Sequence, residues 1–153
     1  MKGRLFIIEG GDGSGKATQT RLLTEHLQRD GYDVKSVSYP DYDSDSSALV
    51  KMYLRGDFGS DADAVNPYAA SAFFAVDRFA SYQMKWKAFY EQGGIVIADR
   101  YTTSNMLYQM IKIDDAALRK AYLDWLEDFE FRKMGLPEPD AVFLLDVPLA
   151  VTH

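Results

Sequence analysis

The sequence predicts a three-layer α/β fold, in which a parallel sheet carries helices on both faces. Short apolar runs typical of buried strands alternate along the 153 residues with longer segments of helical spacing. The first apolar run also ends in glycines that open a helix, which is typical of a strand–loop–helix unit. We expect a single domain over residues 1–153, because this length suits one hydrophobic core.

Each predicted strand is a short apolar run bounded by glycines, prolines or polar residues, as expected for strands buried in a parallel sheet. The predicted strands span residues 4–9, 33–39, 95–98 and 141–146. The predicted helices span residues 18–29, 48–54, 67–91, 104–112 and 115–133, and the Asp- and Ser-rich residues 41–47 are predicted as a loop. This order of elements favours a parallel sheet built from successive crossovers.

The helix predicted over residues 67–91 has clear signals at both ends. Asn66 is a favourable N-cap, Pro67 suits the first helical position, and Gly93-Gly94 ends the helix. Its apolar residues cover nearly every side, so we expect it to pack on more than one surface. Its aromatic and Met residues are also common in interfaces, which leaves open whether they fill the core or join two copies of the chain.

Composition excludes several classes of protein. The chain has no cysteine, so neither a disulfide framework nor a Cys-based metal site is possible. A net charge of −6 argues against a broad nucleic-acid surface. No apolar run approaches the roughly 18 residues that a membrane-spanning helix needs, and the start lacks the features of a signal peptide. We therefore expect a cytoplasmic protein without a nucleic-acid or membrane partner.

A phosphate-binding loop is predicted between the first strand and the first helix. Gly10-Gly11-Asp12-Gly13-Ser14-Gly15-Lys16 matches the P-loop pattern G-x-x-x-x-G-K, in which backbone N–H groups surround phosphates and Lys16 approaches the β and γ phosphates. This motif predicts a P-loop NTPase-like fold with ATP phosphates bound by residues 10–18. A glycine-rich turn without a ligand is the alternative.

One position departs from this pattern. The residue after Lys16 is usually Ser or Thr, whose hydroxyl reaches Mg²⁺, but here it is Ala17, and Thr18 follows. Alanine cannot bind a metal, so Asp12 is the obvious substitute, and impaired Mg²⁺ binding is the alternative.

A second candidate site lies at the end of the third predicted strand. Asp99 can hold Mg²⁺, and Arg100 can bind a phosphate through two hydrogen bonds, at the sheet edge where ligands bind in open α/β folds. We therefore expect Lys16, Asp12, Asp99 and Arg100 to be catalytic and Asp12 and Asp99 to hold the metal. A local salt bridge at a strand end is the alternative.

Four blocks of sequence together resemble the thymidylate kinase family. They are the loop from Glu9 to Lys16, Tyr39-Pro40, the segment Phe73-Phe74-Ala75-Val76-Asp77-Arg78, and Asp99-Arg100-Tyr101-Thr102-Thr103-Ser104-Asn105 followed by Tyr108-Gln109. The resemblance implies ATP-dependent phosphorylation of dTMP to dTDP with Mg²⁺, in a homodimer. It also implies that the dTMP site contains Tyr39, Tyr42, Arg55, Phe74, Arg78, Arg100, Ser104, Asn105, Tyr108 and Gln109.

Several of these assignments have structural alternatives. Phe74 is implied to stack on the thymine ring, but it could instead fill the core. Arg78 is implied to approach the base or the monophosphate, but in an apolar setting its partner could be a distant carboxylate. Arg55 could be a charge at a helix C-terminus, and Tyr108 and Gln109 could be helix surface.

Thymidylate kinases continue beyond the fourth strand through a lid and a fifth strand. The sequence stops at His153, so we expect these parts to be missing and the 153-residue chain to be weakly active or inactive by itself. Two rival functions stay open: another P-loop nucleoside or nucleotide kinase, and a non-catalytic nucleotide-binding homologue, which Ala17 favours.

Overall fold

A computed structural model describes residues 2–11 and 13–146. The chain divides into two compact units. The first contains Met1–Tyr39, Gln83–Tyr101 and Pro137–His153, and the second contains Pro40–Tyr82 and Thr102–Leu136. Each unit is described by itself.

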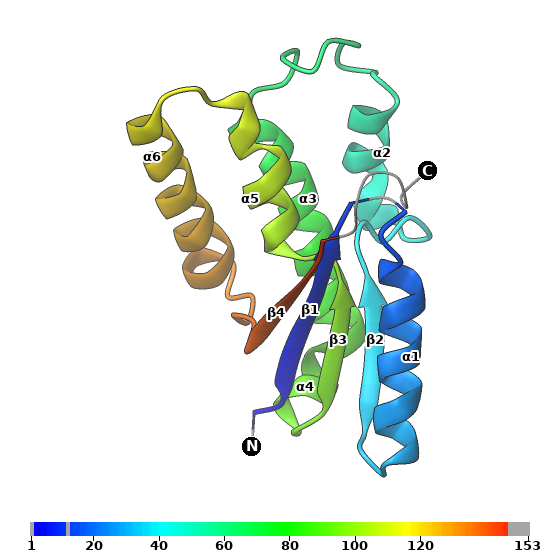
Figure 1. Cartoon of the computed structure of the whole chain (residues 1–153). Helices are drawn as coiled ribbons and strands as arrows, with labels where there is room; N and C mark the ends of the chain where they lie inside the picture. Colours follow the sequence, from blue (N-terminus) through cyan, green and yellow to red (C-terminus); the bar gives the residue numbers. More distant parts are fainter. Residues whose placement is uncertain (1, 12, 147–153) are drawn as a thin grey trace. The chain divides into compact units, whose positions relative to one another are not determined.

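The first unit is built on a parallel sheet of four strands (Figure 1). Its strands are β1 (Arg4–Gly10), β2 (Val34–Ser38), β3 (Ile95–Asp99) and β4 (Ala141–Leu145), in the order β2-β3-β1-β4. The register pairs Ile8 with Asp99 and Ser38 with Asp99, so the carboxyl ends of β1, β2 and β3 meet at one edge. This edge is where the predicted loop and the Asp-Arg pair lie.

Two helices of this unit follow from the crossovers between strands. The helix α1 (Lys16–Arg29) connects β1 to β2, and α4 (Lys87–Glu91) precedes β3. Right-handed crossovers that run in opposite directions along a sheet place their helices on opposite faces, so α1 and α4 cover different faces (Figure 1). The predicted parallel sheet with helices on both faces is therefore confirmed. The core includes Leu5, Ile7, Val96, Ile97 and Ala98, all fully buried.

The second unit is helical. It contains η1 (Asp45–Ser47), α2 (Ala48–Leu54), α3 (Pro67–Ser81), α5 (Thr102–Tyr108), η3 (Met110–Lys112), α6 (Ala116–Glu127) and η4 (Asp128–Lys133). Asn66 caps α3 by accepting a hydrogen bond from the Ala69 N–H at 2.9 Å, and Asp115 caps α6 in the same way. These two side chains fix where the helices begin.

Four predicted elements differ in detail from the structure. The helix predicted over 67–91 is interrupted by a π-helical turn, η2 (Tyr82–Trp86), whose wider backbone buries both terminal aromatic rings and leaves Met84 exposed. The helix predicted over 104–112 begins at Thr102, because the left-handed conformation of Arg100 ends the strand, and it gives way to the 3₁₀ turn η3 after Tyr108. The predicted loop 41–47 contains the 3₁₀ turn η1, and the helix predicted over 115–133 gives way to the π-helical turn η4 after Glu127.

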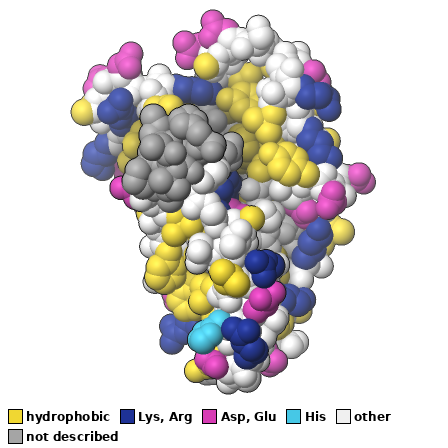
Figure 2. Space-filling model, turned by 45° about the vertical axis from the view of Figure 1, so that its right-hand side comes forward, with side chains coloured by type: hydrophobic (Ala, Val, Ile, Leu, Met, Phe, Trp, Pro, Cys, Tyr) yellow, Lys and Arg dark blue, Asp and Glu magenta, His cyan; other side chains and the backbone are white. Residues whose placement is uncertain are grey.

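The surface carries charges of both signs. On the described part of the face in Figure 2, Lys and Arg side chains are interspersed with Asp and Glu. Within residues 2–11 and 13–146, no helix is both long enough and apolar enough to span a membrane.

The Asn66 cap gives a direct test of how α3 is positioned. We expect Asn66→Ala to lower the free energy of unfolding by about 1 kcal/mol, because the Ala69 N–H loses its acceptor. Asn66→Asp retains an acceptor and serves as the control. Urea unfolding followed by circular dichroism measures both, and equal stability of Asn66→Ala and the wild type would contradict the assigned cap.

Candidate functional site

The predicted phosphate loop joins β1 to α1 directly. Gly13 and Gly15 have positive φ angles of 79° and 89°, which favour glycine, and the Ser14 N–H donates to the Gly11 carbonyl at 3.2 Å. A side chain at Gly10 would meet Ser14 Oγ at 2.8 Å and the Leu145 carbonyl at 3.0 Å. Glycine is therefore required there for the loop to lie against β4.

The predictions for Asp12 lie outside the described residues. Its proposed contacts with phosphate and metal therefore stay predictions. The described loop residues occupy the expected strand-to-helix position, and Ala17 and Thr18 are exposed on the first turn of α1. The N-cap of α1 is Gly15, which has no side chain to occupy the helix N-terminus. This terminus can therefore receive an anion.

Lys16 and Asp99 lie together at the carboxyl edge of the sheet. Lys16 Nζ is 4.0 Å from Asp99 Oδ1, and both side chains are largely buried. Burial raises the pKa of the Asp99 carboxyl and the Glu9 carboxylate raises it further, whereas Lys16 and Arg100 lower it. Asp99 is thus an ionisable group held in an environment that disfavours its charge, which is common at functional sites.

Arg100 is held in an unusual backbone conformation. Its φ angle is 69°, and it is the one residue other than glycine with a positive φ among those described. Its N–H donates to the Ile8 carbonyl at 3.0 Å, and its Nη1 lies 3.6 Å from Oε1 of the buried Glu9. A left-handed arginine is strained, and such strain is concentrated at binding and catalytic sites.

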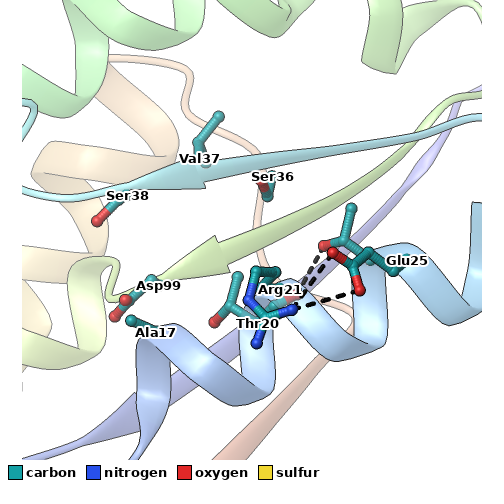
Figure 3. A pocket seen from close by; sticks show the side chains of 9 residues that line it. Ala17, Thr20, Arg21, Glu25, Ser36, Val37, Ser38 and Asp99 are labelled. Atoms are coloured by element: carbon teal, nitrogen blue, oxygen red, sulfur yellow. Dashed lines mark hydrogen bonds and ion pairs between the residues drawn. The ribbon is translucent and has the colours of Figure 1, made fainter.

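A hollow of about 300 Å³ opens between α1 and β2 beside this edge (Figure 3). It is lined by Ala17, Thr20, Arg21, Thr24, Glu25, Ser36, Val37, Ser38 and Asp99. Ala17 and Asp99 lie at one end of it, and Arg21 and Glu25 form an ion pair at the other. The Thr20 hydroxyl is buried in its wall without a hydrogen-bond partner among the described residues. Because alanine has a short side chain, Ala17 leaves space in this hollow next to the Asp99 carboxylate.

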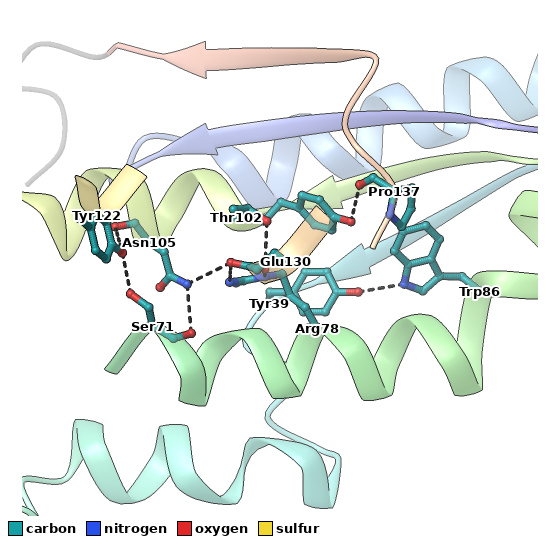
Figure 4. Close-up of polar contacts among 10 residues, drawn as sticks. Tyr39, Ser71, Arg78, Trp86, Thr102, Asn105, Tyr122, Glu130 and Pro137 are labelled. Carbon is teal, nitrogen blue, oxygen red and sulfur yellow. Dashed lines mark hydrogen bonds and ion pairs between the residues drawn. The ribbon is translucent and has the colours of Figure 1, made fainter. Parts of the chain in front are cut away.

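The second unit contains a buried ion pair. Arg78 in α3 donates from Nε and Nη2 to the two carboxylate oxygens of Glu130 at 2.7 and 2.8 Å (Figure 4). Only 2% of the Arg78 side chain and none of that of Glu130 is exposed. Glu130 is thus the distant carboxylate that the sequence left open as a partner for Arg78.

The ion pair belongs to a wider buried network. Thr102 Oγ1 donates to Glu130 at 3.0 Å, and Asn105 Nδ2 contacts Glu130 at 3.4 Å and the Ser71 carbonyl at 3.2 Å. Tyr122 lies at its far end, with its hydroxyl 2.5 Å from Ser71 Oγ, and burial raises the pKa of Tyr122 to about 12. The network joins α3, α5, α6 and η4 within one unit.

The two adjacent phenylalanines of α3 have different surroundings. Phe73 packs between Tyr53 and Phe58, with ring centroids 6.3 and 5.5 Å away. Phe74 contacts the edge of Tyr53 alone among the described ring pairs, at 6.1 Å. Both side chains are partly exposed. Phe74 thus has fewer described ring contacts than Phe73.

The remaining predicted residues are distributed over both units. Tyr39 is buried in the first unit, where its hydroxyl accepts a hydrogen bond from Trp86 Nε1 at 2.8 Å. In the second unit Tyr42 and Tyr108 are exposed, and Ser104 is partly buried. Arg55 ends α2 and pairs with Asp57 at 2.7 Å, as a helix C-terminal charge would. Gln109 is buried, and its Oε1 has no hydrogen-bond partner among the described residues.

Sequence reasoning missed Glu130 and Thr20. A signal for Glu130 was present, because it stands between Phe129 and Phe131 in an aromatic stretch, where an acidic residue requires a buried partner. Thr20 follows Lys16 by four residues and therefore lies on the same side of α1, but threonine is too common on helices to stand out.

Comparison with known proteins gives a consistent result. A family model described as Thymidylate kinase matches residues 8–153. The probable thymidylate kinase of Pyrococcus abyssi is 32% identical over 149 residues, which cover 97% of this chain and 67% of that protein. The thymidylate kinase of Mycobacterium tuberculosis is 33% identical over 144 residues, which cover 94% of this chain and 65% of that protein.

Solved structures of thymidylate kinases also match the fold of this chain. The thymidylate kinase of Candida albicans matches with a TM-score of 0.74 and 28% identity, covering 99% of this chain and 66% of that one. The thymidylate kinase of Ehrlichia chaffeensis matches with a TM-score of 0.69 and 27% identity. The chain spans about two thirds of the length of these relatives.

The raised pKa of Asp99 predicts a pH-dependent stability. A carboxyl with a raised pKa in the folded state destabilises that state as the pH rises through this pKa. We therefore expect Asp99→Asn to melt at a higher temperature than the wild type at pH 7. The difference should shrink as the pH falls below the ordinary pKa of an aspartate, because the folded and unfolded wild-type carboxyls then both bind a proton.

Differential scanning calorimetry at several pH values measures this effect. Asp114→Asn is a suitable control, because Asp114 is exposed and replacing it is expected to change the melting temperature little. A variant Asp99→Asn that melts below the wild type at pH 7 would show that the contacts of the charged carboxylate outweigh its burial.

Proposed function

This chain belongs to the thymidylate kinase family, and from that premise we propose that it phosphorylates dTMP to dTDP with ATP as the phosphoryl donor. The observation that carries the proposal is the meeting of Lys16, Asp99 and Arg100 at one sheet edge beside a phosphate loop. Phosphoryl transfer requires positioned charges more than reactive side chains, and this edge supplies them.

The loop is proposed to hold ATP. Backbone N–H groups of residues 10–18 surround the phosphates, and the N-terminus of α1 adds a favourable dipole. Lys16 supplies a positive charge to the β and γ phosphates. Because Lys16 is largely buried, solvent screens its charge poorly, so its attraction for a nearby phosphate is stronger than at an exposed position.

Magnesium is proposed as the metal that accompanies ATP. Among the described residues, no group of three or more His, Cys, Asp and Glu could hold a metal ion. Magnesium in kinases needs only one or two carboxylates, with phosphates and water as its other ligands, so Asp99 together with Asp12 fits. When bound, the ion neutralises charge on the transferring phosphate.

The dTMP site is proposed to contain the residues that the family resemblance implies. Arg100 and Tyr39 of the first unit are assigned to the monophosphate, with Tyr42. In the second unit, Phe74 is assigned to stack on thymine, Arg78 to approach the base or the monophosphate, and Asn105 to lie near the nucleoside. Arg55, Ser104, Tyr108 and Gln109 complete the proposed set. The unpartnered Gln109 Oε1 supports this, since a buried acceptor without a donor indicates a missing partner.

Transfer then needs no covalent help from the protein. An oxygen of the dTMP phosphate attacks the γ-phosphorus, the bond to the β-phosphate oxygen breaks, and ADP leaves. Lys16 and Arg100 position the two phosphate groups and stabilise the spread negative charge. The strained backbone of Arg100 supports this role, because it fixes the guanidinium in advance of binding.

Several finer assignments stay proposals. We propose a cytoplasmic homodimer in which residues 1–153 fold as one domain. The exposed Val76 of α3 and the exposed Met84 support a contact between copies, because Met and apolar residues are common in interfaces. Because the chain belongs to the thymidylate kinase family, the two rival functions, another nucleotide kinase and a non-catalytic homologue, are not favoured.

Calorimetric titration with dTMP, UMP and AMP tests the proposed substrate. We expect dTMP to bind most tightly, and Phe74→Ala to weaken it by about tenfold or more through lost stacking, which corresponds to about 1.4 kcal/mol. Phe73→Ala is the matched control, because it removes a neighbouring ring of equal size that packs against Tyr53 and Phe58. Preference for UMP or AMP, or an equal loss in both variants, would contradict the proposal.

The space beside Ala17 predicts a gain of metal affinity. Ala17→Thr adds a hydroxyl at the end of the hollow that Asp99 lines, so the Mg²⁺ concentration that half-saturates ATP binding should fall by about fivefold. Ala17→Val has the same shape without the hydroxyl and should show no such gain. Titration of Mg²⁺ against ATP binding measures both, and equal behaviour of Thr and Val would assign no metal role to this position.

A further inference from the structure

Two threonines one turn apart on α1 differ in how their hydroxyls are bonded. Both line the hollow between α1 and β2, and Thr20 is only 6% exposed and Thr24 only 8%. A helical threonine often donates to the carbonyl four residues earlier, and Thr24 Oγ1 donates to the Thr20 carbonyl at 2.7 Å. Thr20 Oγ1 makes no such bond to the Lys16 carbonyl and has no hydrogen-bond partner among the described residues. Its hydroxyl is therefore free to bind a group that enters the hollow.

The other hydroxyls that line the hollow are not in this state. Ser36 and Ser38 are exposed, so bulk water can solvate them. The Thr24 hydroxyl already has a partner. A buried hydroxyl without a partner destabilises the fold, and such a group in a native structure indicates a bound water or ligand. Among the hydroxyls that line this hollow, Thr20 is thus the one that points to an occupant.

The hollow has room for water and lies beside a carboxylate. Its volume of about 300 Å³ is several times the roughly 30 Å³ that a water molecule occupies in the liquid. At one end, Ala17 replaces the residue whose hydroxyl usually reaches Mg²⁺, and its short side chain leaves space next to Asp99 (Figure 3). Thr20 follows Ala17 by three residues, so it lies on the same face of α1, one turn from that end.

We propose that Thr20 is a positioning residue for Mg²⁺, whose hydroxyl accepts a hydrogen bond from a water in the hydration shell of the ion. The inference rests on the proposed use of ATP with Mg²⁺. Three residues advance a helix by about 4.5 Å, which is more than a Mg–O bond of about 2.1 Å, so Thr20 acts through a water and not as a direct ligand. Thr20 thus compensates for the hydroxyl that Ala17 lacks.

The chemistry of a hydrated magnesium ion suits this arrangement. Mg²⁺ in kinases retains several of its waters, and a water bound to a cation donates hydrogen bonds because its lone pair faces the metal. Two acceptors line the hollow where such a water would lie, the Thr20 hydroxyl and the Asp99 carboxylate. Groups that hold metal ligands in this way determine their orientation and thereby the affinity for the metal.

The variant Thr20→Val retains the shape of the side chain and removes its oxygen. We expect the Mg²⁺ concentration that half-saturates ATP binding to rise by about tenfold, as is typical when a group that orients a metal ligand is lost. Thr20→Ser retains the hydroxyl and should restore most of the affinity. The melting temperature of metal-free Thr20→Val should not fall, because the lost hydroxyl had no partner among the described residues. A threonine with a purely structural role would show the reverse.

Thr24→Val is the matched control. It makes the same replacement one turn further along α1, in the wall of the same hollow, but removes a hydroxyl that is bonded to the Thr20 carbonyl. We expect its melting temperature to fall slightly and its Mg²⁺ requirement to stay at the wild-type value, which is the opposite of the result expected for Thr20→Val.

The experiment is calorimetric titration of the whole chain and its variants with ATP at a series of Mg²⁺ concentrations, together with scanning calorimetry of the metal-free proteins. A raised Mg²⁺ requirement in Thr20→Val alone, rescued by Thr20→Ser, supports the inference. An unchanged requirement in Thr20→Val, or an equal rise in Thr24→Val, overturns it.

The double variant Ala17→Thr/Thr20→Val tests whether the two positions serve the same ion. A hydroxyl at position 17 fills the space beside Asp99, so removing the Thr20 hydroxyl should then change the Mg²⁺ requirement little. An undiminished loss in the Ala17→Thr background overturns the inference. A wild type that does not bind ATP, or binds it equally with and without Mg²⁺, refutes the proposed function and this inference together, whereas Mg²⁺-dependent binding that Thr20→Val leaves unchanged refutes this inference alone.

Discussion

The parallel pairing of β1 with β3 is the constraint on which the first unit depends. Ile8 lies beside Asp99 in this pairing, so the end of β1 and the end of β3 reach the same edge. The positions of the candidate functional residues in that unit depend on this pairing, because the phosphate loop continues β1 and the Asp-Arg pair ends β3. A shift of register would separate Lys16 from Asp99 while leaving each local motif intact.

The two units treat their charges in different ways. At the sheet edge, Lys16 Nζ lies 4.0 Å from Asp99 Oδ1, and Arg100 Nη1 lies 3.6 Å from Glu9 Oε1. In the helical unit, Arg78 and Glu130 are bound at 2.7 and 2.8 Å and fully enclosed, so their geometry is fixed before any ligand arrives. The first arrangement suits charge stabilisation, and the second suits recognition of shape and hydrogen-bond pattern.

Local signals in the sequence were sufficient for much of the fold and for part of the site. The glycine spacing before Lys16, the Asn66-Pro67 start and the apolar runs all depend on neighbouring residues, and the structure confirms the elements that they predicted. The left-handed φ of Arg100 could not be predicted, because the Ile8 carbonyl and Glu9 of another strand hold it. Glu130 was missed for a similar reason: it lies 52 residues from Arg78, and no local pattern specifies such a partner.

The π-helical turn that carries Glu130 makes the network sensitive to the number of residues in this segment. A π-turn is in effect an α-helix with one residue inserted, and each residue of a helix advances the side chains by about 100°. Loss of a single codon in Asp128–Lys133 would therefore restore a regular helix and rotate the carboxylate out of the network. A relative that differs in length by one residue at this place would therefore have to hold Arg78 and Asn105 by other means.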